Sequence, residues 1–107
     1  MNPRRVHELM RTRFPPFNAA EHEWTNIAGA QGADVSLLKS FVAAHIRAGE
    51  VLVEVHRKEG ALLPREQAAS YIASHLGEGT IRVADREFKS AVVVASNGVA
   101  AGWQIGA

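Results

Sequence analysis

Histidines that precede glutamates are the first residues in the chain that could do chemistry, because zinc hydrolase sites are often built from this pair. Such a site needs a second histidine one helical turn later, so that both imidazoles reach one metal ion from the same helix face. His7-Glu8 is followed at that place by Arg11, and His22-Glu23 is followed by Asn26. An arginine would repel the metal, and an asparagine is not the required histidine. Neither pair therefore predicts a zinc centre.

The other candidate catalytic groups are also incomplete. Glu54 and His56 share one face of a predicted strand and could bind a divalent ion, but two ligands do not make a site. His45 and His75 lie on apolar faces of predicted helices, where a histidine is usually a core residue with hydrogen-bonded ring nitrogens. No glycine-rich segment has the spacing of a phosphate-binding loop, and no serine lies in a Gly-x-Ser-x-Gly turn. We expect no enzymatic activity, no metal and no cofactor.

Charged residues gather in two predicted loops and in the first predicted helix. Glu21 and Glu23 flank His22, and Asp85 and Glu87 flank an arginine. These carboxylates could meet basic residues of a protein partner. The first helix carries four arginines against a single glutamate: Arg4, Arg5, Arg11 and Arg13. Such a helix could bind the phosphate backbone of a nucleic acid.

The composition bounds the function classes further. A chain of 107 residues builds one core, so we expect a single domain over residues 1–107. The absence of cysteine excludes disulfide scaffolds, zinc ribbons, iron–sulfur sites and thiol catalysis. Apolar runs are interrupted by charge well before the roughly 20 residues that span a bilayer. We therefore expect a cytoplasmic protein with no membrane partner.

The elements that must position these residues begin with helices. Asn2 and Pro3 are suited to the start of a helix, and Pro15-Pro16 must end it. Gly49 is suited to the C-terminal cap of the helix predicted over residues 34–48. Apolar residues at helical spacing predict four helices. Three of them cover residues 3–13, 34–48 and 64–76. The second helix in the order is a short segment with a capping box at Asn18 and Glu21 and an apolar stripe of Trp24, Ile27 and Ala28.

Alternating patterns predict strands over residues 50–56, 80–83, 90–96 and 99–105, with turns at 57–60 and 85–88. Asn97-Gly98 predicts a two-residue hairpin turn. Counting outward from it pairs Val94 with Ala101 and Val92 with Trp103 on one bulky face. The opposite face is then flat, with Ala91, Ala95, Ala100 and Gly102.

The order of these elements predicts an α+β fold. It has three N-terminal helices, a strand, a fourth helix and a C-terminal antiparallel β-hairpin or meander, and helices cover one face of the sheet. The oligomeric state stays open, because the C-terminal strand could pair with a second copy.

A pattern in the C-terminal half resembles a known group of proteins. It consists of Glu66-Gln67-Ala68, Tyr71-Ile72, Gly79-Thr80-Ile81-Arg82-Val83, Phe88 to Val94, and Asn97-Gly98-Val99 to Gly102-Trp103. In these segments the chain resembles the small bacterial immunity proteins of contact-dependent growth-inhibition toxin systems. The resemblance implies a cytoplasmic inhibitor that binds one cognate toxin domain, often a nuclease, and blocks its active site or substrate entry. That group shares no invariant inhibitory residue, so the resemblance assigns none.

Two functions follow as hypotheses. The first is a non-catalytic protein-binding module, an immunity protein that neutralises a toxin by occlusion, with Glu21, Glu23, Asp85 and Glu87 as its partner contacts. Inhibitors of nucleases are commonly acidic, and a net charge of +1 leaves only these local carboxylates to match a basic cleft. The alternative is a small nucleic-acid-associated or regulatory protein that uses the arginines of the first helix.

Overall fold

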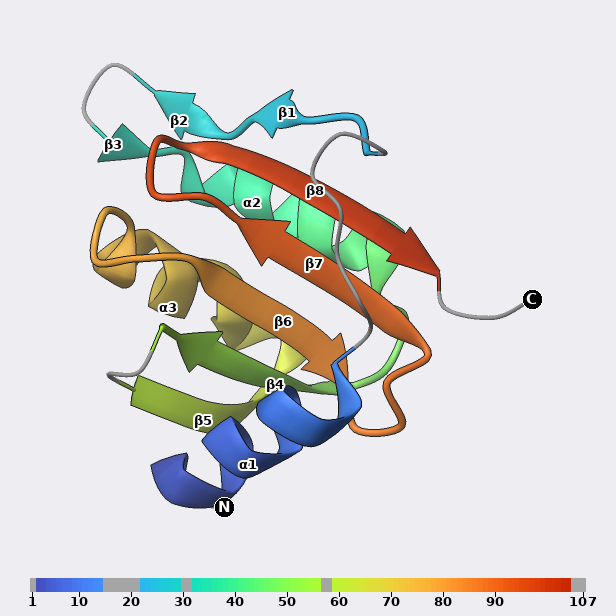
Figure 1. The fold of residues 1–107 in the computed structure, drawn as a ribbon. Coiled ribbons are helices and arrows are strands. Elements are labelled where there is room, and N and C mark those ends of the chain that lie inside the picture. The colour runs from blue at the N-terminus through green and yellow to red at the C-terminus, as the bar shows by residue number, and fades with distance from the viewer. Residues whose placement is uncertain (1, 15–21, 30–31, 57–58, 105–107) are drawn as a thin grey trace.

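Figure 1 shows the computed structural model, which describes residues 2–14, 22–29, 32–56 and 59–104. Within these ranges the chain forms three α-helices, one six-stranded antiparallel sheet and a separate two-stranded ladder. The α+β class agrees with the sequence analysis, but the number and order of the elements do not. No helix in the described ranges is long and apolar enough to cross a membrane.

The three helices form where local caps predict them. α1 (Pro3–Arg13) begins at Asn2, whose side chain accepts the Arg5 amide at 2.9 Å. α2 (Val35–His45) begins at Asp34, which accepts the Leu37 amide at 3.0 Å. It ends before the predicted Ala48, because Ile46 is already extended. α3 (Arg65–His75) follows Pro64 and agrees with the prediction to within one residue at each end.

The main sheet has the order β1-β8-β7-β6-β4-β5, and all neighbouring strands are antiparallel. Its strands are β1 (Thr25–Asn26), β4 (Glu50–Val55), β5 (Glu59–Pro64), β6 (Ile81–Asp85), β7 (Ser90–Val94) and β8 (Val99–Gln104). β2 (Ala28–Gly29) and β3 (Gly32–Ala33) form the small ladder. The sequence pattern does not predict β5, since it places Glu59 and Gly60 in a turn.

The predicted second helix is wrong in the part that the structure describes. Its apolar stripe lies in extended chain, where Thr25 and Asn26 pair with β8. Ile27 donates its amide to the Gly98 carbonyl at 2.9 Å and accepts the Asp34 amide at 2.9 Å. Pairing with a distant strand thus satisfies backbone groups that the local pattern assigned to a helix. The proposed capping box, Asn18 and Glu21, lies outside the described residues.

Helices cover both faces of the sheet, which corrects the expectation that they cover one. Val51, Val53 and Val55 of β4 pack in one core with α2 and α3. Leu52, which points to the other side of the same strand, packs in a second core with residues of α1. Figure 1 shows α1 in front of the sheet and α2 and α3 behind it.

The β7–β8 hairpin has a different register from the predicted one. Ala95 donates its amide to the Val99 carbonyl at 2.8 Å, and the Gly98 amide donates to the Ala95 carbonyl at 3.0 Å. The loop therefore has three residues and ends at Gly98, whose φ of 91° is a conformation that glycine tolerates. The pairs become Val94 with Ala100 and Val92 with Gly102.

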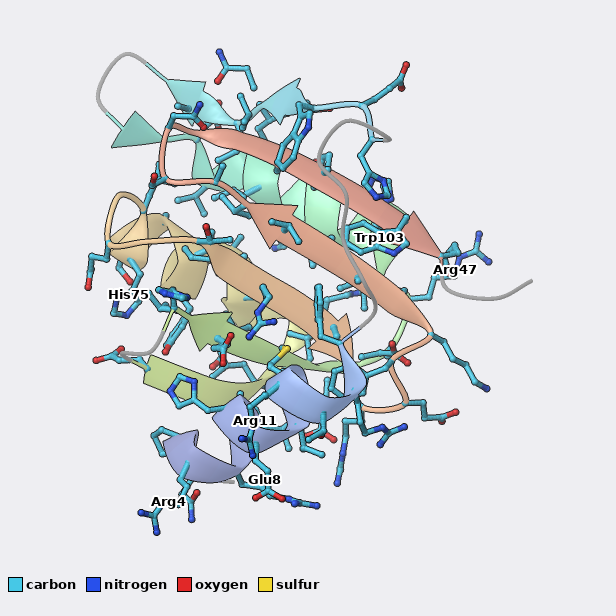
Figure 2. All side chains as sticks on the ribbon, in the orientation of Figure 1. Arg4, Glu8, Arg11, Arg47, His75 and Trp103 are labelled. Atoms are coloured by element: carbon cyan, nitrogen blue, oxygen red, sulfur yellow. The ribbon has the colours of Figure 1, made fainter. Side chains whose placement is uncertain are left out.

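This one-residue shift changes which side chains share a face. Val92 and Val94 now lie on the same face as Ala100 and Gly102, so the predicted bulky and flat faces are both wrong. Trp103 lies on the opposite face, where its ring meets that of Phe14 edge-on at a centroid distance of 6.0 Å. Figure 2 shows Trp103 on the side of the sheet that carries α1.

Candidate functional site

The acidic residues predicted to meet a partner have different surroundings. Asp85 is only 8% exposed. Its Oδ1 accepts the amides of Lys89 at 2.7 Å and Ser90 at 2.9 Å, so it closes the β6–β7 turn. Glu87 is exposed in that turn and pairs with Lys89 at 3.0 Å. Glu23 is exposed before β1, and Glu21 lies outside the described residues.

The structure does not bring Glu23, Asp85 and Glu87 into one patch. In Figure 1 the β6–β7 turn lies near the C-terminal end of α1, while the segment before β1 lies at the opposite edge of the sheet. Asp85 is occupied by its own turn, which leaves Glu87 as the exposed carboxylate there.

The arginines of α1 also divide into two groups. Arg5 pairs with Glu8 at 3.0 Å. Arg13 lies over the Phe88 ring, with its Cζ 4.9 Å from the ring centroid. Arg4 and Arg11 are both exposed on α1 (Figure 2). Of these four arginines, Arg11 alone lines a hollow.

That hollow, called here the polar hollow, has a volume of ≈ 510 Å³ and lies where α1 meets the sheet. It is lined by five residues: His7 and Arg11 of α1, Glu54 of β4, His56 directly after β4, and Arg82 of β6. Glu54 is 4% exposed, and Arg82 is its partner in the β4–β6 register. Because these residues come from separate parts of the chain, local spacing could not have assembled this group.

Both oxygens of Glu54 are bonded. Oε1 accepts Arg82 Nε at 2.8 Å and also Arg82 Nη2. Oε2 lies 2.6 Å from His7 Nδ1. Since an ionised carboxylate can only accept, the proton of this contact lies on Nδ1 of the histidine, and Nε2 is the remaining ring nitrogen. The Arg82 guanidinium lies over the Phe14 ring at 5.1 Å, which fixes it from another side.

A second hollow, called here the β5–α3 groove, has a volume of ≈ 410 Å³ and lies along the edge of the sheet. It is lined by Leu63 of β5 and, from α3, by Glu66, Gln67, Ser70, Tyr71 and Ser74. The sequence analysis predicts none of these as a site residue. The signal that could have found them is α3 itself, whose outer face is polar beside an apolar strand.

Carboxylates lie beside the β5–α3 groove, around Tyr71 and His75. Tyr71 donates its hydroxyl to Glu59 Oε2 at 3.4 Å. His75 lies between two carboxylates, with Nε2 3.0 Å from Glu59 and Nδ1 3.1 Å from Glu78. Burial raises the pKa of the Tyr71 phenol, and the charges of Glu59 and Glu78 raise it further. A raised phenol pKa is what nearby negative charge produces, because it opposes the phenolate.

The groove adjoins a free strand edge. His56 donates its amide to the Thr80 carbonyl, so the even-numbered residues of β4 direct their backbone groups toward β6. The backbone groups of the odd-numbered residues of β4 therefore bond to β5, at Glu59, Ala61 and Leu63. The backbone groups of Gly60 and Leu62 consequently point away from β4; Gly60 is buried against Val6 of α1, and Leu62 is half-buried. β5 ends the sheet, and no strand among the described residues pairs with its outer side.

A third, smaller hollow of ≈ 230 Å³ contains two histidines, His22 and His45, beside Glu23. Burial lowers the pKa of His45. Its ring lies so close to β8 that a Cβ on Gly102 would stand 2.5 Å from His45 Cγ. In the part of the chain that is described, no group of three or more His, Cys, Asp or Glu side chains could hold a metal ion.

Comparisons with known proteins give no relative. No family model, curated protein or solved structure matches the chain. The hollows and the free edge of the sheet are therefore the structural features that bear on function.

Proposed function

We propose that the protein is a non-catalytic binding protein whose partner is another protein, held at the outer edge of β5 and in the β5–α3 groove. The observation that carries the proposal is the open edge of β5 beside a shallow hollow of ≈ 410 Å³. In the cell, the proposed role is that of a cytoplasmic immunity protein. It neutralises a cognate toxin domain by occluding the active site of that domain.

The edge of β5 suits strand addition. Natural proteins protect free edges with charged residues, prolines or bulges, because unpaired backbone groups invite another strand. In β5 the charge and the proline stand at the ends, Glu59 and Pro64, and the middle is Ala61-Leu62-Leu63. An extended segment of the partner can bond to the outward groups of the half-buried Leu62 and place alternate side chains in the groove.

The charge around the groove selects a basic segment. Glu66 lines the groove, and Glu59 and Glu78 stand at its end around His75. Arg65, at the start of α3, turns its guanidinium to the carbonyls of Ile46 and Arg47. A toxin domain that acts on nucleic acid carries basic residues around its cleft, so the groove and such a domain are complementary.

A growth competition tests the proposal and does not require the toxin to be identified first. Cells that carry the gene are competed on a solid surface against an isogenic strain from which it is deleted. We expect the deletion strain to be inhibited by its parent and to be rescued by the wild-type gene. Equal growth of the deletion strain and its parent would overturn the immunity function.

Two charge reversals locate the surface. Glu66→Lys places a cation in the groove, whereas Glu87→Lys makes the same change in the β6–β7 turn. We expect Glu66→Lys to lose rescue and Glu87→Lys to keep it, with both proteins present at wild-type levels. Rescue by both, or loss with Glu87→Lys alone, would contradict binding at the groove.

A second candidate is the nucleic-acid-associated function, which one observation favours. Arg4 and Arg11 are both exposed on α1 (Figure 2). Phosphate contacts lose affinity steeply with salt, so binding of labelled RNA or DNA that falls by about tenfold or more between 50 and 200 mM salt would support it. No binding at the lower salt concentration would eliminate it.

A further inference from the structure

From the geometry of the polar hollow we infer a second binding site, independent of the β5–α3 groove, that takes the phosphate group of a small organic molecule. The site comprises Arg11 of α1, Arg82 of β6 and the two histidines, His7 and His56, around the buried Glu54.

The charges of the lining favour an anion. Two of the five lining residues are arginines, which stay ionised at every physiological pH, and two are histidines. Glu54 is the one carboxylate in the lining, and it is already compensated by Arg82 and bonded to His7. An arriving anion therefore meets Arg11 and the imidazoles without an opposing free carboxylate.

The donors are positioned before any ligand arrives. Glu54 accepts from Nε and from Nη2 of Arg82, which leaves three of the five N–H groups of the guanidinium, two on Nη1 and one on Nη2. The Phe14 ring restricts the same guanidinium from another side. Because Glu54 also fixes the His7 ring, two of the lining side chains lose little conformational freedom on binding.

The number and geometry of the donors fit phosphate. Its oxygens point in several directions and can accept from groups on separate elements, here α1, β6 and the end of β4. Guanidinium groups match phosphate oxygens in pairs. A volume of ≈ 510 Å³ falls within the range of small-molecule sites and exceeds what a bare phosphate fills, so the phosphate is carried on a larger molecule.

A titration followed by NMR tests the site. The protein, labelled at its histidine and arginine side chains, is titrated at low salt with inorganic phosphate, with AMP and with adenosine. We expect saturable shifts of the His7, His56 and Arg82 side-chain signals with phosphate and with AMP, and none with adenosine. No saturable shift with phosphate or AMP, or equal shifts with adenosine, would overturn the inference.

Two arginines of the same helix give a matched pair of variants. Arg11→Gln removes a cation from the lining, whereas Arg4→Gln removes one that is exposed but lies outside the hollow. Loss of one charged hydrogen bond should weaken AMP binding about tenfold in Arg11→Gln. Arg4→Gln should change the affinity less than about twofold, since exposed charges interact weakly through water. Equal losses in the two variants would assign the binding to the general field of α1 and contradict a site in the hollow.

Discussion

His7 and Glu54 lie 47 residues apart in the sequence, and the Nδ1 atom of the histidine stands 2.6 Å from the Oε2 atom of the carboxylate. This contact joins α1 to β4, the strand next to the edge strand β5. Arg82 completes the group from the neighbouring strand. A glutamate in a strand of valines is thereby kept buried and fully bonded, which is the condition under which burial of a charge is tolerated.

Glu54→Gln should destabilise the protein. It removes the charge that compensates Arg82 and leaves a partly buried cation beside a neutral amide. We expect a loss of about 2–3 kcal/mol in the free energy of unfolding, measured by urea denaturation. Glu8→Gln is the control, because its pair with Arg5 is exposed and should cost less than about 0.5 kcal/mol. Equal costs would show that the buried group does not stabilise the fold.

Gly102→Ala should be destabilising, because the new Cβ would stand 2.5 Å from His45 Cγ and force the ring or β8 to move. We expect about 1–3 kcal/mol, as for other overpacked sites. In Gly49→Ala nothing lies within 4 Å of the new Cβ, so this variant should be neutral or slightly more stable. Thermal unfolding of the two variants compares them, and a Gly102→Ala protein as stable as Gly49→Ala would show that β8 and α2 are not in close contact.

Asp85→Ala should lower stability without involving a partner. The substitution leaves the part-buried Lys89 amide and the buried Ser90 amide without their acceptor, at a cost of about 1–3 kcal/mol. Glu87→Ala, in the same turn but exposed, should change stability by less than about 0.5 kcal/mol. Urea midpoints decide the matter, and similar values for the two variants would refute a structural role for Asp85.

His45 should make the fold less stable in mild acid. Burial lowers its pKa below the ordinary value of 6.5, so the unfolded chain takes up a proton near pH 6.5 and the folded protein only at lower pH. Between those values the unfolded state binds more protons, and the free energy of unfolding falls as pH decreases from 7 toward 5.

The His45→Asn variant isolates this contribution, since asparagine does not titrate. Its urea midpoint should depend less steeply on pH between 7 and 5 than that of the wild type, whatever its absolute stability. His22 and Glu23 line the same hollow and are unchanged in the variant. Identical slopes would mean that His45 does not contribute to the acid sensitivity.

The helices can be predicted from sequence because their signals are local. Asn2 and Asp34 accept amides three residues ahead, and the sequence places both helix starts to within one residue. The sequence does not predict β1, because its pairing partner β8 is distant in the chain. It does not predict β5, because the start of that strand resembles a turn. The sequence also predicts the hairpin at Asn97-Gly98, but Gly98 ends a three-residue loop, and that single residue moves Trp103 to the other face.

The candidate sites are harder to predict for the same reason. Arg11 and the pairing of Glu54 with His56 on one strand face are visible in the sequence, but Arg82 and His7 join them only through the fold. The sequence does contain one usable signal, a glutamate among valines, since a charge at a buried position requires partners. The β5–α3 groove depends on β5 being an edge, which only the sheet order reveals.

Site-specific photocross-linking tests the central claim, that a partner protein binds along β5 and α3, most directly. The photoreactive residue p-benzoylphenylalanine replaces the exposed Gln67 in the groove or, as a control, the exposed Lys39 of α2. After irradiation of cells that carry the gene, the account predicts that Gln67 forms one discrete cross-link, to the toxin identified by the growth competition, and that Lys39 does not. A cross-link to that toxin from Lys39 and none from Gln67 would contradict the account.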